Sequence, residues 1–416
     1  MIYHLVNYLD KTFDIPGTGL FQYLSFRSGM AIIVALLVGM LIGKRIIDIL
    51  RRKQIGEEIR ELGLEGQAQK RGTPTMGGII ILISVLVPLL LFGDLTNVYL
   101  QIMILATVWL GTIGFIDDYI KVFKGRKSGL SGRFKIVGQV GLGIIVGTTM
   151  WLSQDIVVRE KTTQQSATTE VAYVDDGEGN QRSVLLSAPE KTTKTTIPFV
   201  KDSEFDYHWL VPAETPLGNA ATWVIYVLAA ILIITAVSNG ANLTDGLDGL
   251  SAGVSAIVVL VLGVLAYVGS NIMYADYLNI MYIPASGELV VFAAAFIGAL
   301  IGFIWYNCFP AQVFMGDTGS LAIGGMIATF ALLIRKELLL PLLCGVFLIE
   351  GFSVVIQVVY FKYTKRRYGE GRRVFLMSPL HHHYQKKGYP EAKIVVRFWI
   401  IAFVLALVGL STLKLR

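Results

Sequence analysis

The chain has 416 residues, of which 54% are hydrophobic and only 16% are charged. Soluble globular domains carry about a quarter charged residues, so a fold with its whole surface in water is excluded. The formal net charge of +6 is spread over several loops between apolar stretches, which argues against a nucleic-acid-binding protein.

Apolar stretches of about 20 residues recur along the chain, each long enough to cross a ~30 Å hydrocarbon core as a helix. Ten are recognisable, with centres near residues 40, 85, 107, 144, 229, 260, 297, 327, 350 and 404. The stretches near 107 and 327 are the least clean. The sequence therefore predicts an all-α integral membrane protein with about ten transmembrane helices, forming one polytopic domain over residues 1–416.

The distribution of Lys and Arg predicts the orientation of this domain. Five connections share one side of the membrane, and the first, second and fifth of them carry 8, 6 and 10 of the chain's 36 Lys and Arg. Basic loops remain in the cytoplasm, so we expect these five connections inside and both termini outside. The connections cover residues 44–75, 117–135, 238–251, 306–319 and 362–397.

Residues 154–219 differ from the rest of the chain in composition. They are rich in Thr, Ser and acidic residues and contain no long apolar run. We expect an external loop inserted in the domain, disordered or partly β-hairpin, with short strands at stretches such as "SVLL". No catalytic role is expected for it.

Unusual polar motifs gather on the predicted cytoplasmic side. Asp117 and Asp118 end the third apolar stretch in "GFIDDYIKV", and Asp317 lies in "FMGDTGS". Acids at such places indicate a functional site, although a lone carboxylate at a helix end can simply be solvated and Asp317 can simply cap a helix. Together the motifs predict an active-site cleft at the cytoplasmic face.

The motif "NLTDGLDGL" places Asn242, Asp245 and Asp248 three residues apart. In a helical turn such residues share one face. The two Asp-Gly pairs are equally typical of a plain turn, and both interpretations stay open.

The donor chemistry narrows the kind of site. Carboxylate oxygens suit Mg²⁺ or Mn²⁺ better than zinc, and Mg²⁺ commonly completes its ligand shell with substrate phosphates. Basic residues that can meet phosphate oxygens stand close by in the sequence, among them Lys70, Lys121, Lys127 and Arg133. Carboxylates, cations and a membrane interface together suggest phosphoryl transfer onto a lipid.

Three consecutive histidines, His381, His382 and His383, lie in "SPLHHHYQKKGYPE". Consecutive side chains do not face one another on a helix, so the three do not form a simple metal site. Imidazole titrates near pH 7 and can serve phosphate binding or catalysis. Packing at the interface is the alternative.

These motifs resemble those of the phospho-N-acetylmuramoyl-pentapeptide transferases, the bacterial translocase I family within the polyprenyl-phosphate N-acetylhexosamine-1-phosphate transferases. The resemblance rests on "GTPTMGG", "GFIDDYIKV", "NLTDGLDGLSAG", "FPAQVFMGDTGSLA" and "SPLHHHYQKKGYPE", in this order and spacing. It covers residues 28–414 apart from the long 154–219 loop. The last motif is the one that points to the muramoyl-pentapeptide branch.

The resemblance implies a Mg²⁺-dependent, usually dimeric, ten-span enzyme of the bacterial inner membrane. Such an enzyme moves phospho-N-acetylmuramoyl-pentapeptide from UDP to undecaprenyl phosphate and yields lipid I and UMP. Asp117 and Asp118 match the catalytic pair, Asp317 matches the metal ligand with Asp117 beside it, and His381–His383 match a histidine motif. The positions that match the nucleotide and diphosphate pocket are Lys70, Thr75, Asn242, Asp245, Asp248, Asn307 and Phe314.

Several alternatives stay open at this point. Asp117 can be a general base, an orienting metal ligand or a covalent nucleophile. A sister transferase that uses UDP-N-acetylglucosamine is the nearest other function. A transporter is the rival of a different class, although transporters place their acids near the membrane midplane and these acids lie at span ends.

Overall fold

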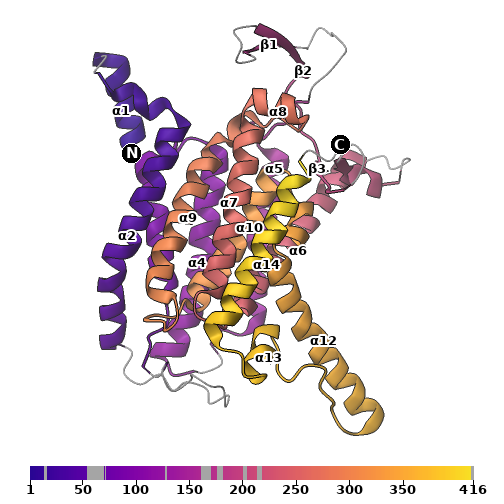
Figure 1. Ribbon diagram of the computed structural model, residues 1–416. Coiled ribbons are helices and arrows are strands. Elements are labelled where there is room, and N and C mark those ends of the chain that lie inside the picture. The colour runs from indigo at the N-terminus through magenta and orange to yellow at the C-terminus, as the bar shows by residue number, and fades with distance from the viewer. Residues whose placement is uncertain are drawn as a thin grey trace.

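The structure, a computed structural model, describes residues 1–13, 16–53, 70, 72–126, 129–160, 170–175, 181–199, 204–212 and 218–413. This part of the chain is mainly helical, with two small antiparallel hairpins. Long helices run side by side as a bundle, and the hairpins stand at one end of it (Figure 1).

Nine helices in the described ranges are long and apolar enough to cross a membrane, and a tenth, α3, is apolar but shorter. The predicted all-α, multi-pass membrane fold is therefore confirmed. The ten helices are α2 (Leu24–Lys53), α3 (Gly78–Phe92), α4 (Val98–Phe123), α5 (Gly132–Leu152), α6 (Gly218–Thr244), α7 (Leu250–Ser270), α9 (Glu288–Asn307), α10 (Gly316–Leu333), α12 (Gly345–Tyr368) and α14 (Glu391–Ser411).

Shorter helices connect or flank these ten. One of them, α1, was not predicted, because its twelve residues are too few for a span. The shorter elements are α1 (Ile2–Phe13), η1 (Thr18–Gln22), η3 (Tyr207–Leu210), α8 (Ile272–Leu278), η4 (Pro284–Gly287), η5 (Glu337–Leu339), α11 (Leu340–Leu343) and α13 (Leu380–Lys386). Figure 1 shows the start of α1 and the end of α14 at the same end of the bundle as the hairpins.

Helix α3 is short because the residues before it form hydrogen bonds with another loop. Its 15 residues rise only about 22 Å at ~1.5 Å per residue, less than a ~30 Å core. The preceding segment pairs instead with the loop between α9 and α10. The backbone amide of Gly77 donates to the Phe314 carbonyl at 2.8 Å, and the Phe314 amide donates to the Pro74 carbonyl at 2.8 Å. Two motifs far apart in the sequence thus become neighbours.

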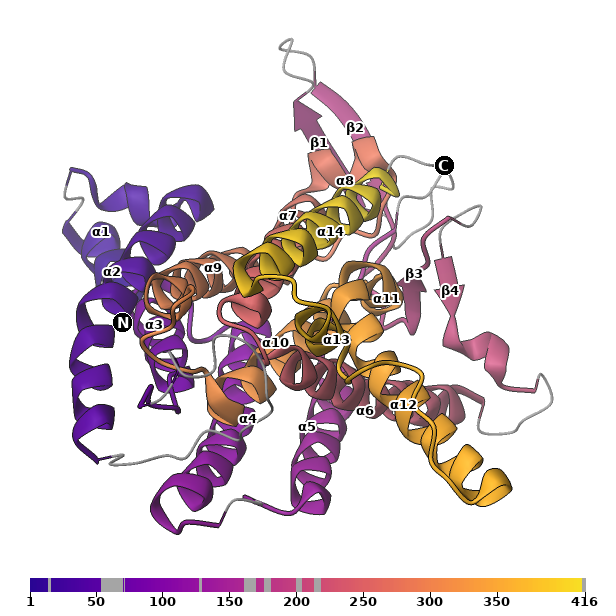
Figure 2. The same ribbon diagram turned by 60° about the horizontal axis from the view of Figure 1, so that its bottom comes forward.

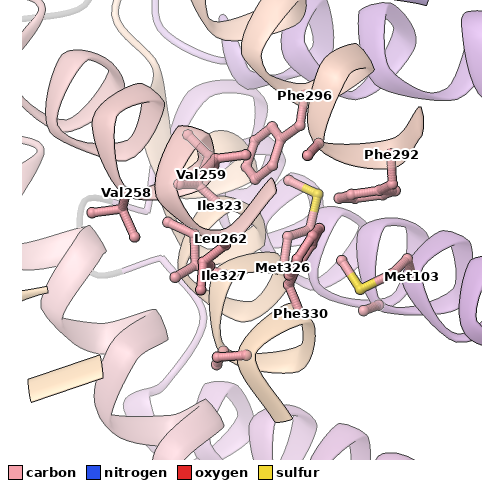
Figure 3. Close-up of a cluster of buried hydrophobic side chains, with 14 of the residues drawn as sticks. Met103, Val258, Val259, Leu262, Phe292, Phe296, Ile323, Met326, Ile327 and Phe330 are labelled. Atoms are coloured by element: carbon pink, nitrogen blue, oxygen red, sulfur yellow. The ribbon is translucent and has the colours of Figure 1, made fainter. Parts of the chain in front are cut away.

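Helix α10 is the centre of the bundle. Every residue from Thr318 to Leu333 is buried, and Figure 3 shows Ile323, Met326 and Phe330 among side chains of the surrounding helices. Its mean hydropathy of 1.3 is the lowest of the nine candidate spans. A helix enclosed by other helices does not face lipid, which explains why its stretch near residue 327 was hard to recognise in the sequence.

The two hairpins lie within residues 154–219, the segment predicted to be external. Strand β1 (Glu170–Asp175) pairs antiparallel with β2 (Gln181–Leu186), from Glu170↔Leu186 to Asp175↔Gln181. Strand β3 (Lys194–Thr196) pairs antiparallel with β4 (Glu204–Asp206). The predicted short strand at "SVLL" is confirmed, since this stretch lies in β2.

The second hairpin docks on the bundle. The Thr196 amide and the Thr195 hydroxyl both donate to the Arg335 carbonyl, each at 3.1 Å. The Tyr207 hydroxyl donates to Glu337 Oε1 at 3.3 Å. Arg335 and Glu337 are each only 1% exposed, so this part of the external segment covers charged groups of the bundle.

Candidate active site

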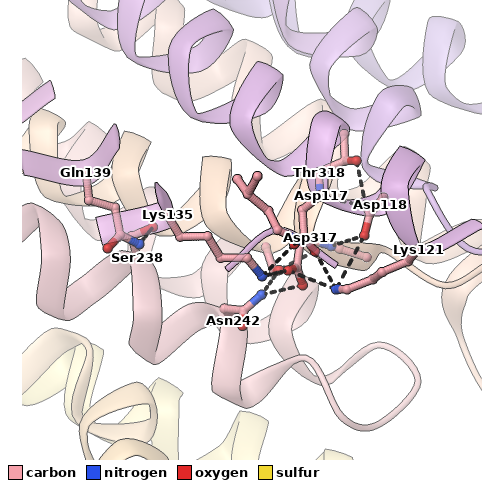
Figure 4. Close-up of polar contacts among 12 residues, drawn as sticks. Asp117, Asp118, Lys121, Lys135, Gln139, Ser238, Asn242, Asp317 and Thr318 are labelled. Atoms are coloured by element: carbon pink, nitrogen blue, oxygen red, sulfur yellow. Dashed lines mark hydrogen bonds and ion pairs between the residues drawn. The ribbon is translucent and has the colours of Figure 1, made fainter. Parts of the chain in front are cut away.

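The predicted polar motifs meet at the end of the bundle opposite the hairpins. Figure 2 brings this end forward and shows α13 beside the ends of α12 and α14. Figure 4 shows the centre of the site, where side chains from α4, α5, α6 and α10 point toward one another. Residues separated by up to 200 positions in the chain are in contact there.

Asp118 holds the amino end of α10. Its Oδ2 accepts hydrogen bonds from the Thr318 amide at 2.8 Å and the Thr318 hydroxyl at 2.6 Å, and its Oδ1 accepts from the Asp317 amide at 3.1 Å. The first amides of a helix lack partners within the helix and favour a negative charge. Asp118 therefore caps α10 from another helix.

A glycine on α4 permits this close approach. Gly114 precedes Asp118 by about one helical turn. A Cβ at Gly114 would stand 2.1 Å from the Asp317 carbonyl oxygen, which no side chain can tolerate. The two helices thus touch through their backbones, and small residues at such interfaces are typical of membrane bundles.

Asp117 contacts cations and caps no helix in the described part of the chain. Its Oδ2 lies 2.5 Å from Lys121 Nζ, and its Oδ1 lies 3.1 Å from Lys135 Nζ and accepts from the Leu130 amide at 2.7 Å. Asp117 is fully buried. Adjacent residues on a helix point about 100° apart, and here this separates a capping carboxylate from an ion-paired one.

Asp317 completes the group from the first turn of α10. Lys121 Nζ lies 3.1 Å from Asp317 Oδ2, Lys135 Nζ contacts the same oxygen, and Asn242 Nδ2 donates to Oδ1 at 2.9 Å. Three carboxylates thus share two ammonium groups, so the centre keeps an excess of negative charge that a cation would offset.

The donor set fits a hard divalent metal ion. Asp117, Asp118 and Asp317 each offer a carboxylate oxygen, and these oxygens lie within 4.8 Å of one another. The buried Oδ2 of Asp117 has no hydrogen bond of good geometry among the described residues, despite its contact with Lys121. Oxygen ligands of this kind are those that Mg²⁺ takes in proteins.

A second ionic cluster stands beside the first. Lys70 Nζ lies 2.7 Å from Asp248 Oδ1 and 2.6 Å from Glu391 Oε1, which also accepts from the Asp248 amide at 2.8 Å. The Lys70 ammonium is 5.8 Å from the centre of the Phe314 ring. Because Glu391 begins α14, this cluster joins the first loop, the α6–α7 turn and the last helix.

Two other predicted residues, Asn307 and Thr75, lie around these clusters. Asn307 is buried and holds loops together, since its Oδ1 accepts from the Gly249 amide and its Nδ2 donates to the Val313 carbonyl, both at 2.9 Å. Thr75 and Asp118 flank Gly316, where a Cβ would stand 2.9 Å from Thr75 Oγ1.

Asp245 lies between α6 and α7 near both clusters. Burial is the main reason that its pKa is raised to about 8, and the negative charges of Asp317, Asp118 and Asp248 raise the pKa further. A carboxyl group of this kind holds its proton near neutral pH unless a cation approaches.

The three histidines have different polar partners, although the rings of His381 and His382 touch, with centroids 4.2 Å apart. His381 is fully buried, and its Nδ1 lies 3.1 Å from Oε2 of the buried Glu350. His382 Nδ1 lies 2.7 Å from Gln385 Oε1, and burial is the main reason that its pKa is lowered to about 4. His383 Nδ1 accepts from the Leu376 amide at 3.1 Å.

Of the other predicted cations that the structure describes, Arg133 does not join the centre. Arg133 is exposed on α5, about 200° around the helix from Lys135. Lys127 lies outside the described residues. Lys121, in contrast, contacts all three aspartates, at 2.5 Å from Asp117, 4.0 Å from Asp118 and 3.1 Å from Asp317.

Sequence reasoning missed three residues of the site. Lys135 was detectable, because it precedes the buried Gly138 and Gln139 by three and four residues and so lies on their face of α5. Glu391 ends the motif "SPLHHHYQKKGYPE" but was not singled out within it, and Glu350 carried no comparable local signal, since its partner is 31 residues away.

Comparison with known proteins agrees with this geometry. The chain matches the model of glycosyl transferase family 4 over residues 191–335 and the phospho-N-acetylmuramoyl-pentapeptide-transferase signature 1 over residues 70–82. Proteins named phospho-N-acetylmuramoyl-pentapeptide-transferase from Flavobacterium psychrophilum, Flavobacterium johnsoniae and Parabacteroides distasonis are 58%, 57% and 55% identical to it, with all of each chain covered. The chain therefore belongs to the phospho-N-acetylmuramoyl-pentapeptide-transferase family.

Proposed function

We propose that this protein transfers phospho-N-acetylmuramoyl-pentapeptide from its UDP carrier to undecaprenyl phosphate, which yields lipid I and UMP. The observation that carries the proposal is the group of Asp117, Asp118 and Asp317 with Lys121 and Lys135, at one end of an apolar bundle. Carboxylates for a metal and ammonium groups for phosphate oxygens are what phosphoryl transfer requires.

Mg²⁺ is the proposed cofactor. Asp117 and Asp317 would hold it, with Asp118 close enough to share in its binding. When bound, Mg²⁺ neutralises charge on the diphosphate of the donor. Of the three carboxylates, Asp118 is already engaged in three hydrogen bonds to α10, so its main contribution is to position Asp317.

Lys121 and Lys135 would orient the diphosphate. In the structure both ammonium groups lie between Asp117 and Asp317. A donor phosphate offers them a stronger acceptor set than a single carboxylate does, because phosphate carries several charged oxygens. Transfer is then favoured by positioning and charge neutralisation, with little covalent work for the protein.

The attacking group is a phosphate monoester with a second pKa near 6. It is mostly ionised at neutral pH, so the reaction needs no strong general base. Asp117, fully buried with both carboxylate oxygens in contact with lysines, is better suited to orient the cations than to attack phosphorus. We therefore favour direct transfer over an aspartyl-phosphate intermediate.

The second cluster would bind the nucleotide. Lys70 presents a cation near the face of the Phe314 ring, and Asp248 and Glu391 fix the ammonium group from behind. Thr75, Asn242, Asp245 and Asn307 complete the proposed pocket. Lys127 remains a predicted phosphate contact, whereas Arg133, exposed on α5, is the weaker candidate.

A groove suited to a lipid phosphate lies between α12 and the segment that leads to α13. Its volume is about 550 Å³. Apolar side chains and three basic groups line it together, and a phosphorylated polyprenyl chain needs both kinds of surface. The lining includes Val358, Phe361, Leu376, Lys362, Arg373 and Lys386.

We further propose a homodimer in the bacterial inner membrane, with the site on the cytoplasmic face, both termini outside and residues 154–219 as an external insertion. The basic loops at the site's end of the bundle support this orientation. The start of α1, the end of α14 and the hairpins all lie at one end of the bundle, which agrees with this orientation (Figure 1).

The direct test is UMP release by the purified protein. We expect release only when UDP-N-acetylmuramoyl-pentapeptide, undecaprenyl phosphate and Mg²⁺ are all present, with a lipid-linked product. Release with UDP-N-acetylglucosamine instead would favour the sister transferase. Uptake of the UDP-sugar into vesicles without a lipid product would favour a transporter.

A further inference from the structure

A fully buried acid and histidine link α12 to the histidine segment. Glu350 and His381 both have no exposed surface. His381 Nδ1 lies 3.1 Å from Glu350 Oε2, and the His381 backbone amide donates to the same oxygen at 3.4 Å. Of the 24 residues of α12 only six are buried, and Glu350 is one of them. Burial of an acidic side chain on the inward face of such a helix costs free energy, so its presence there indicates a function.

The other side of the imidazole touches the α6–α7 turn. A Cβ on Gly246 would stand 2.2 Å from His381 Nε2. Gly246 itself is exposed, so it lies between the imidazole and solvent. Neither ring nitrogen has a hydrogen bond of good geometry among the described residues, so the imidazole is held by the close ionic contact of Nδ1 with Glu350 and by the turn at Nε2. His381 thus packs against the inner side of the turn.

This turn carries the residues that matter for the site. Asp245 precedes Gly246, Asp248 follows it and binds Lys70, and Asn242 at the end of α6 binds Asp317. The same stripe of α12 also contacts the end of α6, where a Cβ on Gly240 would stand 3.1 Å from the Cβ of Phe347. A shift of the imidazole would therefore be transmitted to both ionic clusters.

We propose that Glu350 and His381 are positioning residues that act as one unit: the buried carboxylate fixes the imidazole, and the imidazole fixes the Asn242–Asp248 turn. This inference rests on the proposed function, and it gives His381 a role in geometry and none in proton transfer. Removal of one member of a buried pair leaves its partner uncompensated, whereas replacement of both members can be nearly neutral.

The test uses the full-length protein with Glu350→Gln, His381→Gln and the double variant. Each single variant is expected to lower kcat for UMP release by at least about tenfold and to lower Tm. The double variant, an amide pair that cannot exchange protons at neutral pH, should return to within about fivefold of the wild-type kcat. Glu337→Gln, another buried glutamate at the opposite end of the bundle, is the matched control and should lower Tm without lowering kcat.

Two results would overturn the proposal. The first is a double variant with restored Tm and a kcat as low as that of His381→Gln, since the imidazole itself would then take part in chemistry. The second is an equal loss of kcat in Glu337→Gln, which would make the effect general. Wild-type UMP release is measured first and tests the proposed function separately.

A second measurement covers the case in which the double variant does not fold. Glu350→Gln alone keeps the size of the side chain, and its pH profile of kcat should keep the wild-type shape at lower amplitude. A displaced limb of that profile would mean that Glu350 sets the titration of a reacting imidazole, and it would overturn the proposal.

Discussion

Asp118 of α4 caps α10 through Thr318, 200 residues further along the chain: its Oδ2 accepts from the Thr318 amide at 2.8 Å and from the Thr318 hydroxyl at 2.6 Å. Its neighbour Asp117 makes no such contact and pairs with Lys121 and Lys135. The adjacent aspartates thus have different partners and should have separable functions.

The first prediction compares Asp117→Asn with Asp118→Asn. Loss of a helix-capping charge typically costs about 1–2 kcal/mol, so Asp118→Asn should lower the free energy of unfolding by about that amount. Asp117→Asn removes a buried carboxylate but no cap and should change stability less. Both should reduce UMP release by at least about 100-fold. Thermal unfolding in detergent, beside turnover, checks this, and equal Tm losses would contradict the division of roles.

The second prediction concerns Asp317 and the metal. Chelation of divalent ions should abolish wild-type UMP release, and Mg²⁺ should restore it. Asp317→Asn should weaken Mn²⁺ binding by about tenfold or more, because the carboxylates of Asp117 and Asp118 cannot replace the lost charge. Electron paramagnetic resonance measures this binding. Asp155→Asn, an exposed aspartate of the external segment, is the control. Normal Mn²⁺ binding by Asp317→Asn would refute the metal assignment.

The third prediction separates Lys135 from Arg133 on α5. Lys135 contacts Asp117 and Asp317, whereas Arg133 is exposed. Lys135→Gln should reduce turnover by at least about tenfold, because Asp117 and Asp317 lose a cation that also meets phosphate. Arg133→Gln should reduce it far less. Turnover of the two purified variants checks this prediction. A larger loss of turnover in Arg133→Gln than in Lys135→Gln would indicate that Arg133 is the phosphate contact.

The fourth prediction concerns the external segment. Replacement of residues 170–186, the β1–β2 hairpin, by a Gly/Ser linker should leave turnover within a few-fold, because the hairpin lies at the opposite end of the bundle (Figure 1). Replacement of residues 190–210 should cost several degrees of Tm, because it uncovers Arg335 and Glu337. If the two replacements lower Tm equally, docking of the second hairpin does not stabilise the protein.

The fifth prediction concerns acid stability and His382. Its pKa is lowered to about 4 from 6.5, chiefly by burial, so the folded state favours the neutral ring. The unfolded state takes up a proton first as pH falls, and stability should decline between about pH 6.5 and pH 4. His382→Gln removes this contribution. The fall in Tm from pH 7 to pH 4.5 should be smaller in the variant, and an unchanged fall would contradict a half-buried ring that stays neutral in the folded state.

The sequence alone determined the fold class and predicted that the polar motifs share one end of the bundle. A backbone in lipid must satisfy its own hydrogen bonds, so each span has to be a long apolar helix. Each such helix can be recognised from its own stretch of sequence. Loop charge predicted a common side for the polar motifs. Their residue types indicated a metal and phosphate site before any contact was known.

Only the tertiary structure decided which partner each polar residue contacts. Asp118 and Thr318, Lys70 and Glu391, and Glu350 and His381 are distant in sequence, and no local pattern encodes which partner a side chain will meet. Helix α10 shows the same limit, because its low hydropathy follows from neighbours that shield it from lipid. Local periodicity sets the helices, whereas packing between them selects the partners, and the division between capping, ion pairing and support of a turn is a property of that packing.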